Sequence, residues 1–145
     1  IDKITVMVQK EVAQRLSAIP GTPQYGAVTA SVSWYGSVKK LFDVPAGNFI
    51  PRPKVDSSVI QISAGDGLRA SAAVKDEKLL FRVISAAFAQ RRKTLANSLS
   101  FEFSNVSKER ISEIIQNCGF ESGIRGEKLS VYDFVRLSDK LFDEL

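Results

Sequence analysis

The hydrophobic pattern changes character part-way along the chain, at a stretch of small and polar residues over 63–73. Before this stretch, apolar residues form short β-branched or alternating runs, which are typical of strands. After it, they recur every three or four residues, as in amphipathic helices. We therefore expect a mixed α/β part over residues 1–64, a linker over 65–74 and an all-α part over 75–145.

The first part begins with a strand and then a helix. Ile4–Val8 is short, apolar and rich in β-branched residues, so we expect a buried strand. The helix that follows is expected to place Val12, Leu16 and Ile19 on one apolar face and to end at Pro20. A strand that leads directly into a helix is typical of α/β folds.

The remainder of the first part contains one ambiguous segment and two expected strands. Tyr25–Tyr35 fits both strand and helix spacing, and periodicity alone does not decide between them. Val38–Val44 and Val55–Ile62 are expected to be strands, with turn residues at Pro45–Asn48 after the first of them.

The second part carries signals for several helices. Leu80, Ile84 and Phe88 share one helical face. Ser107 is a candidate N-cap for a later helix, and Ser130 is expected to begin the last helix with a capping box.

The composition excludes several kinds of chemistry. The chain has no histidine, which removes the usual general base and the commonest metal ligand. Its single cysteine, Cys118, cannot form a disulfide or a cysteine zinc site within one chain, and we expect it to be a buried apolar residue and the chain to bind no metal. No apolar run approaches the roughly 18 residues of a membrane span, so no membrane partner is expected. The net charge of +4 permits a polyanionic partner.

Two prolines stiffen the segment that follows Phe49. Pro51 and Pro53 force extended backbone and forbid a helix. An aromatic ring on fixed backbone can stack on a nucleic-acid base, although the same ring could simply fill the core. Arg52 and Lys54 could contact phosphate or remain solvated surface charges.

A second group of cations lies in the helical part. Arg91, Arg92 and Lys93 are consecutive at an expected helix junction, where a turn could direct them toward a phosphate backbone. They could equally complement the dipole of the preceding helix. Arg125 is a candidate for another phosphate contact or for an ion pair with Glu127.

Four segments together resemble the ribosomal RNA adenine dimethyltransferases. Phe49–Ser57 resembles the family's FxPxPKVxS motif, and Phe88–Leu99 resembles its FxQRRKTLxNxL helix junction. Met7–Leu16 is similar to the strand and helix that follow the catalytic loop, and Arg125–Ser130 is similar to an R-x-E-x-L-S segment. The order and spacing match over essentially the whole chain, most closely for the KsgA type that acts on small-subunit RNA.

The resemblance implies a fold and an activity. The chain would be the C-terminal remnant of a Rossmann-like methyltransferase domain followed by a small helical RNA-docking domain, with Tyr25–Tyr35 as a helix. The full-length parent would transfer methyl groups from S-adenosylmethionine to two adjacent adenines of small-subunit (16S) ribosomal RNA during ribosome biogenesis. The parent is expected to act as a cytoplasmic monomer on the pre-ribosomal 30S particle.

The resemblance also assigns roles to individual residues. Phe49 matches the aromatic residue that stacks on the flipped-out target adenine. The positions expected to contact RNA are Arg52, Lys54, Arg91, Arg92, Lys93 and Arg125. Ala96 replaces a usual cation, so one phosphate contact is expected to be missing, and Gly126 stands where proline is common, so its loop is expected to be less rigid.

Several family motifs do not occur in the 145 residues. These are the glycine-rich cofactor loop, the ribose-binding acid and the N-L-P-Y catalytic loop, which the resemblance places before Ile1. We therefore expect the chain to be part of a longer protein, to bind no cofactor alone, to be inactive alone and to expose an unpaired sheet edge. The alternatives are a non-catalytic RNA-binding or ribosome-assembly module and an α/β domain that binds protein.

Overall fold

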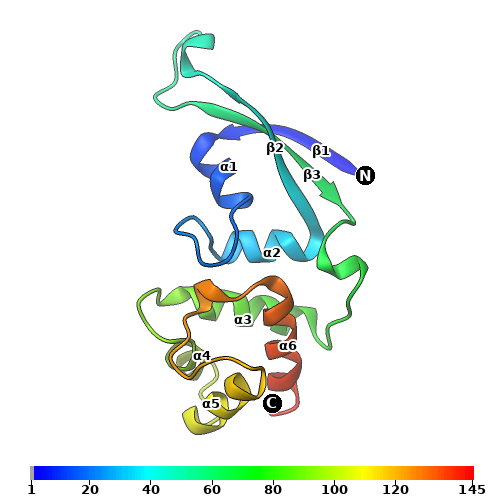
Figure 1. Ribbon diagram of the computed structural model, residues 1–145, viewed down its shortest axis with the longest axis vertical. Coiled ribbons are helices and arrows are strands. Elements are labelled where there is room, and N and C mark those ends of the chain that lie inside the picture. The colour runs from blue at the N-terminus through cyan, green and yellow to red at the C-terminus, as the bar shows by residue number, and fades with distance from the viewer. Residues whose placement is uncertain (1) are drawn as a thin grey trace. The chain divides into compact units, whose positions relative to one another are not determined.

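The computed structural model describes residues 2–145, and the chain divides into two compact units (Figure 1). The sheet unit comprises Ile1–Ile19 and Pro23–Ala72. The helical unit comprises Pro20–Thr22 and Ala73–Leu145. Ile1, at which the predicted first part begins, lies outside the described residues.

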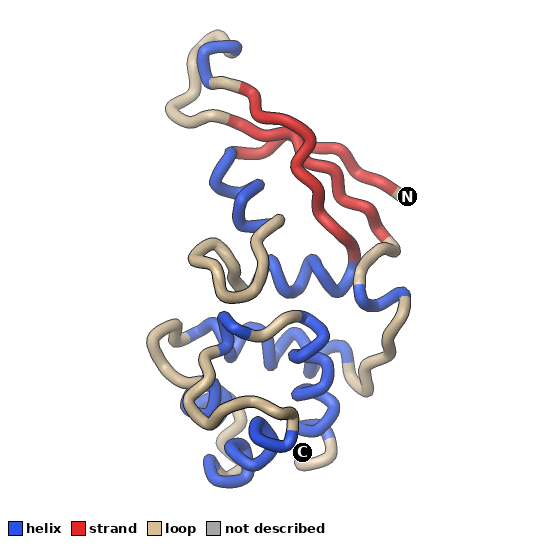
Figure 2. The backbone as a smooth tube through the Cα atoms, in the orientation of Figure 1, coloured by secondary structure: helices blue, strands red, loops and turns tan. Residues whose placement is uncertain are grey.

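The sheet unit is built on three antiparallel strands, coloured red in Figure 2. They are β1 (Lys3–Gln9), β2 (Gly36–Val44) and β3 (Ser57–Ala64). The strand order is β1-β3-β2, so β3 is central and bonds to both neighbours. This arrangement confirms the three predicted strands, although β3 begins two residues after Val55.

Two helices accompany the sheet. They are α1 (Lys10–Leu16) and α2 (Ala27–Tyr35), which contact each other. The ambiguous segment Tyr25–Tyr35 is therefore mainly helical, as the family resemblance implied. Trp34 and Ile60 are among the largest fully buried side chains of this unit.

The prediction that β1 is buried is wrong for the described residues. Ile4, Val6 and Met7 are 40%, 37% and 52% exposed. β1 lies at the edge of the sheet, where it pairs with β3 on one side only. An apolar strand becomes buried only where other elements cover it, and within residues 2–145 these side chains lack that cover.

The predicted apolar face of the first helix is also largely uncovered. Val12 and Ile19 are exposed, and Leu16 is half-buried. Ala13 is instead the buried residue of α1. Helical spacing correctly predicted a helix here, but α1 ends at Leu16, so the predicted end at Pro20 is wrong and Ile19 lies outside the helix. The spacing also does not determine which side of a short helix meets a neighbour.

The predicted linker, residues 65–74, is partly structured. Residues 68–70 of the predicted linker form the short 3-10 helix η2 (Leu68–Ala70), which belongs to the sheet unit. Gly67, just before it, lies so close to the start of β2 that a Cβ would come within 2.4 Å of the Gly36 nitrogen. Only glycine permits this close backbone approach.

The helical unit contains four α-helices. They are α3 (Glu77–Ala89), α4 (Leu95–Glu102), α5 (Lys108–Asn117) and α6 (Val131–Phe142). Among their contacts, α3 packs against α4 and α6, and α5 packs against α4 and α6. No helix within residues 2–145 has the length and apolar character that a membrane span requires.

Each of these four helices begins at a capping side chain. A side-chain oxygen accepts a backbone N–H of the first turn in every case, which satisfies one of the donors that a helix start leaves unpaired. The caps are Asp76, Thr94, Ser107 and Ser130. The predictions for Ser107 and for the Ser130 capping box are therefore confirmed, and Asp133 completes that box.

The helical unit has a well-packed apolar core. Its largest fully buried side chains come from all four helices and from two loops: Leu80, Ile84, Leu95, Leu99, Phe103, Ile111, Ile115, Leu129, Phe134 and Leu137. Phe88 is half-buried, and its ring centroid lies 6.0 Å from that of Phe134. The predicted face of α3 therefore contributes to the core.

Candidate functional site

The proline loop, which we define as residues 45–56, connects β2 to β3. It begins with the 3-10 helix η1 (Ala46–Asn48), in which the Phe49 N–H donates to the Ala46 carbonyl at 3.2 Å. Phe49 follows in extended conformation, with φ −114° and ψ 150°. Its side chain is half-buried, so the ring is neither sealed in the core nor fully exposed.

Two carboxylates hold the base of the proline loop together. The Ser58 hydroxyl donates to Asp43 at 2.6 Å, across the paired ends of β2 and β3. The Ala46 N–H donates to the carboxylate of Asp56 at 2.9 Å. The pKa of Asp43 is lowered because the Ser58 hydroxyl, and secondarily Lys40, stabilises its charged form.

The sequence reasoning missed Asp56. An acidic residue at the end of a loop is a weak signal, because the atom it accepts from depends on how β2 and β3 pair. A correct strand register, with Val44 opposite Ser57, would have brought Asp56 close to the start of the loop.

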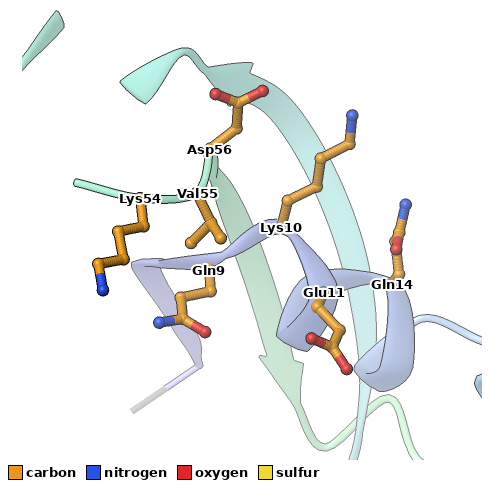
Figure 3. A pocket seen from close by; sticks show the side chains of 7 residues that line it. All are labelled: Gln9, Lys10, Glu11, Gln14, Lys54, Val55 and Asp56. Carbon is orange, nitrogen blue, oxygen red and sulfur yellow. The ribbon is translucent and has the colours of Figure 1, made fainter. Parts of the chain in front are cut away.

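Arg52 and Lys54 are exposed on the proline loop. Lys54 also lines an open hollow of about 420 Å³ beside the start of α1, whose lining residues are Gln9, Lys10, Glu11, Gln14, Lys54, Val55 and Asp56. Figure 3 shows that the ammonium groups of Lys10 and Lys54 point in different directions. The hollow therefore does not focus its two cations on one point, and two carboxylates share its wall.

The basic turn, which we define as Arg91–Lys93, lies between α3 and α4. All three residues are exposed, and the Lys93 N–H donates to the Gln90 carbonyl at 3.0 Å to form the turn. The three cations thus lie at a junction between two helices, as the sequence predicts.

A second segment brings Arg125 to the same end of the helical unit. The Leu95 N–H, just after the basic turn, donates to the Ile124 carbonyl at 2.8 Å. Gly126, on the other side of Arg125, packs against Ala87, just before the basic turn. These two contacts hold the Arg125 backbone beside the helix junction that carries the basic turn.

Arg125 has an acidic neighbour, as one of the two sequence interpretations expected. Its guanidinium lies 3.9 Å from the Glu127 carboxylate, at the long limit of an ion pair. The Arg125 side chain is half exposed, and an exposed pair of this length contributes little to stability. The pair leaves the guanidinium accessible to an anion.

Gly126 and Ala96 depart from the family pattern, and both positions are buried. Gly126 is buried, and a Cβ there would lie 2.8 Å from both the Cβ and the carbonyl oxygen of Ala87. The glycine therefore permits close packing of η3 (Gly126–Lys128) against the end of α3. Ala96 is only 4% exposed, so this position lies in the core of the helical unit rather than on its accessible surface.

The junction of β1 and α1 differs from a Rossmann-type cofactor loop. A Rossmann-type cofactor loop needs glycines between a strand and the following helix, so that the backbone can approach the ligand closely. The connection from β1 to α1 runs directly from Gln9 to Lys10 and contains no glycine. Residues 2–145 contain no group of three or more His, Cys, Asp or Glu that could hold a metal ion.

Comparison with known proteins identifies relatives over nearly the whole chain. The family model for ribosomal RNA adenine dimethylase matches residues 1–141. A ribosomal RNA small subunit methyltransferase A of Lachnoclostridium phytofermentans is 47% identical over 99% of this chain and 49% of its own length. The protein of the same name from Clostridium botulinum is 42% identical over 98% of this chain and 50% of its own length. The chain thus spans about half the length of these curated relatives.

Solved structures share the fold. A dimethyladenosine transferase from Plasmodium falciparum superposes with a TM-score of 0.74 at 23% identity, covering 94% of this chain and 56% of the other. The 23S rRNA methyltransferase ErmE superposes with a TM-score of 0.63 at 19% identity, covering 98% of this chain and 55% of the other. The two units thus occur together in larger proteins.

Proposed function

Because the chain belongs to the ribosomal RNA adenine dimethylase family, we propose that it forms the C-terminal part of an enzyme that methylates ribosomal RNA. The enzyme would transfer methyl groups from S-adenosylmethionine to two adjacent adenines of small-subunit RNA in the cytoplasm. The match of the family model over residues 1–141 is the observation that carries this proposal. The names of these two curated relatives support the small subunit as the target.

Phe49 is proposed to stack on the target adenine. A base must leave its stack before its amino group can be reached, and this costs a few kcal/mol. An aromatic face returns about 1–3 kcal/mol per base. The half-buried ring and the hydrogen bonds at the base of the proline loop support this role, since an already ordered ring loses little conformational entropy when it binds.

The basic turn and Arg125 are proposed to contact the RNA backbone, together with Arg52 and Lys54. Each cation that neutralises a phosphate releases condensed counterions, which favours binding and makes it sensitive to salt. The exposure of Arg52, Lys54 and the basic turn supports this role, because exposed cations reach phosphate with little desolvation cost. Such contacts position the RNA without reading its sequence.

The chain alone is proposed to be inactive. The sequence motifs that the family resemblance links to cofactor binding and to holding the reacting amine do not occur in the 145 residues, which supports this proposal. This chain would supply the stacking surface and the RNA contacts, and the other half would supply the methyl-transfer chemistry.

The test is methyl transfer by a reconstituted enzyme. We define this as the present chain joined to the half of the Lachnoclostridium relative that it does not match. Incubation with S-adenosylmethionine and unmethylated small-subunit particles should give two adjacent dimethyladenines by mass spectrometry of RNA fragments. No transfer, with RNA binding that weakens as salt rises, would favour the non-catalytic RNA-binding module instead.

Charge reversal tests the proposed RNA contacts. Arg91→Glu combined with Arg92→Glu should weaken RNA binding and reduce the slope of log K against log salt by about 1 for each lost contact. Lys108→Glu is the matched control, because Lys108 is an exposed cation at the start of α5, outside this group. An unchanged salt slope in the double variant would place the basic turn outside the RNA interface.

A further inference from the structure

Asp56 is the last residue of the proline loop, and it is hydrogen-bonded both to the start of that loop and to another segment. Its carboxylate accepts the Ala46 N–H at 2.9 Å, so the two ends of the loop are tied together. Its backbone carbonyl accepts the Lys10 N–H at 3.0 Å, at the junction of β1 and α1. One residue therefore connects the loop to itself and to a neighbouring strand-helix junction.

The bond to Ala46 leads directly to Phe49. Ala46 is buried, and its carbonyl accepts the Phe49 N–H at 3.2 Å within η1. A short series of hydrogen bonds thus runs from Lys10 through Asp56 and Ala46 to the backbone of Phe49. The separate bond between Asp43 and Ser58 lies within the paired strands, so it does not fix the position of η1.

We propose that Asp56 is a positioning residue that holds Phe49 in the orientation required for stacking on the target base. This inference rests on the proposed function and extends it to a residue that does not touch the substrate. Stacking requires the Phe49 ring to lie at a fixed distance and angle relative to the target base. A displacement of an active-site group by about 1 Å can lower the rate about 100-fold. A charged carboxylate is a stronger acceptor for a backbone N–H than a neutral oxygen is.

The charge environment argues against a direct RNA contact by Asp56. A carboxylate repels phosphate, and this one stands close in sequence to Arg52 and Lys54, which are proposed to attract it. An exposed carboxylate at this position weakens the attraction of the loop surface for phosphate, so a direct RNA contact does not explain it. Its hydrogen bond to Ala46 gives it a structural role instead.

The test compares three variants of the reconstituted enzyme. Asp56→Ala removes the acceptor for the Ala46 N–H, whereas Asp56→Asn keeps an acceptor oxygen without the charge. Asp66→Ala is the matched control, because Asp66 is an exposed acid of the sheet unit outside the loop. The measurements are kcat with small-subunit particles, RNA dissociation constant, and hydrogen exchange of the Ala46 and Phe49 amides.

Asp56→Ala should lower kcat about tenfold, change RNA affinity less than about twofold and speed exchange of both amides. Asp56→Asn should restore most of the rate, and Asp66→Ala should match the unaltered enzyme. The proposal is overturned by an unchanged kcat in Asp56→Ala, by equal losses in the Ala and Asn variants, or by equal losses of kcat and RNA affinity.

The two proposals fail in different ways. If the unaltered reconstituted enzyme transfers no methyl group, the proposed function fails, while the exchange of the Ala46 and Phe49 amides still reports whether Asp56 orders the loop. If the enzyme is active and Asp56→Ala leaves those amides protected, the function stands and the positioning role fails.

Discussion

The sheet unit and the helical unit differ in how completely they cover their own apolar surface. In the helical unit, all four helices are capped and contribute to one buried core, although Phe101, Tyr132 and Phe142 remain exposed at its surface. In the sheet unit, the edge strand β1 and the helix α1 leave large apolar side chains exposed. From this contrast we expect the helical unit to fold by itself and the sheet unit to be less stable without further cover.

The same contrast applies to the two candidate groups. The basic turn and Arg125 are held by backbone contacts within a closed core, at Leu95 and Ala87. Phe49 lies on the proline loop, and the conformation of this loop depends on a few hydrogen bonds at its base. We therefore expect substitutions near the basic turn and Arg125 to disturb those residues less than substitutions in the proline loop disturb Phe49.

The largest expected effect comes from separating the two units. A peptide of residues 73–145, which is the helical unit without Pro20–Thr22, should be helical and unfold cooperatively, because the fully buried side chains of this core all lie within it. A peptide of residues 1–72 should show no cooperative transition, because it lacks cover for β1 and α1. Circular dichroism during thermal unfolding checks both. A cooperative transition in the sheet peptide would contradict the contrast.

A pair of isoleucine truncations gives the next largest effect. Ile115 is 1% exposed in the helical unit, and Ile4 is 40% exposed in the sheet unit. Ile115→Ala should lower the free energy of unfolding by about 2–5 kcal/mol, because it leaves a cavity. Ile4→Ala should cost less than about 1 kcal/mol. Urea unfolding of the 145-residue chain measures both, and similar losses would show that β1 is covered in solution.

A pair of glycine substitutions sharpens the description of the helical unit. Gly126→Ala should cost about 1–3 kcal/mol, since the new Cβ would collide with Ala87. Gly123→Ala is the control, because a Cβ at Gly123 meets no atom within 4 Å. Urea unfolding measures the free energy of unfolding of both variants. Equal values would show that the segment carrying Arg125 is loosely packed against α3.

The smallest expected effect is a pH dependence that reports on the helical unit alone. Cys118 is the only cysteine in the chain, and burial raises the pKa of its thiol above the ordinary value of 9.0. Above pH 9.0 the unfolded chain loses this proton before the folded chain does, so the free energy of unfolding should fall as pH rises further. Cys118→Ala should remove this part of the fall, as unfolding curves on either side of that pH would show.

The fold was predicted best where the signal is local. The caps at Ser107 and Ser130 and the helix junction at the basic turn depend on residues a few positions apart, and the structure has them as expected. The burial of β1 was predicted wrongly, because burial depends on what covers a strand and not on the strand itself. The spacing of Tyr25–Tyr35 fits two periods and does not decide between strand and helix, and packing against its neighbours selects the helix.

The candidate site was predictable only in part. The residue types at Phe49 and at the basic turn already indicated stacking and phosphate contacts. The role of Asp56 depends on a hydrogen bond across ten residues, and the proximity of Arg125 to the basic turn depends on contacts across about thirty to forty, so neither follows from sequence spacing. The stacking role of Phe49 and the RNA contacts of the cations stay predictions.

The central claim is that Phe49 acts on the reacting base while the cations hold the RNA. Its most direct test is the Phe49→Ala variant of the reconstituted enzyme, with kcat for methyl transfer and the RNA dissociation constant measured on the same preparation. We predict that kcat falls by at least about tenfold while the dissociation constant changes less than about twofold. Equal losses in both quantities, or an unchanged kcat, would contradict the claim.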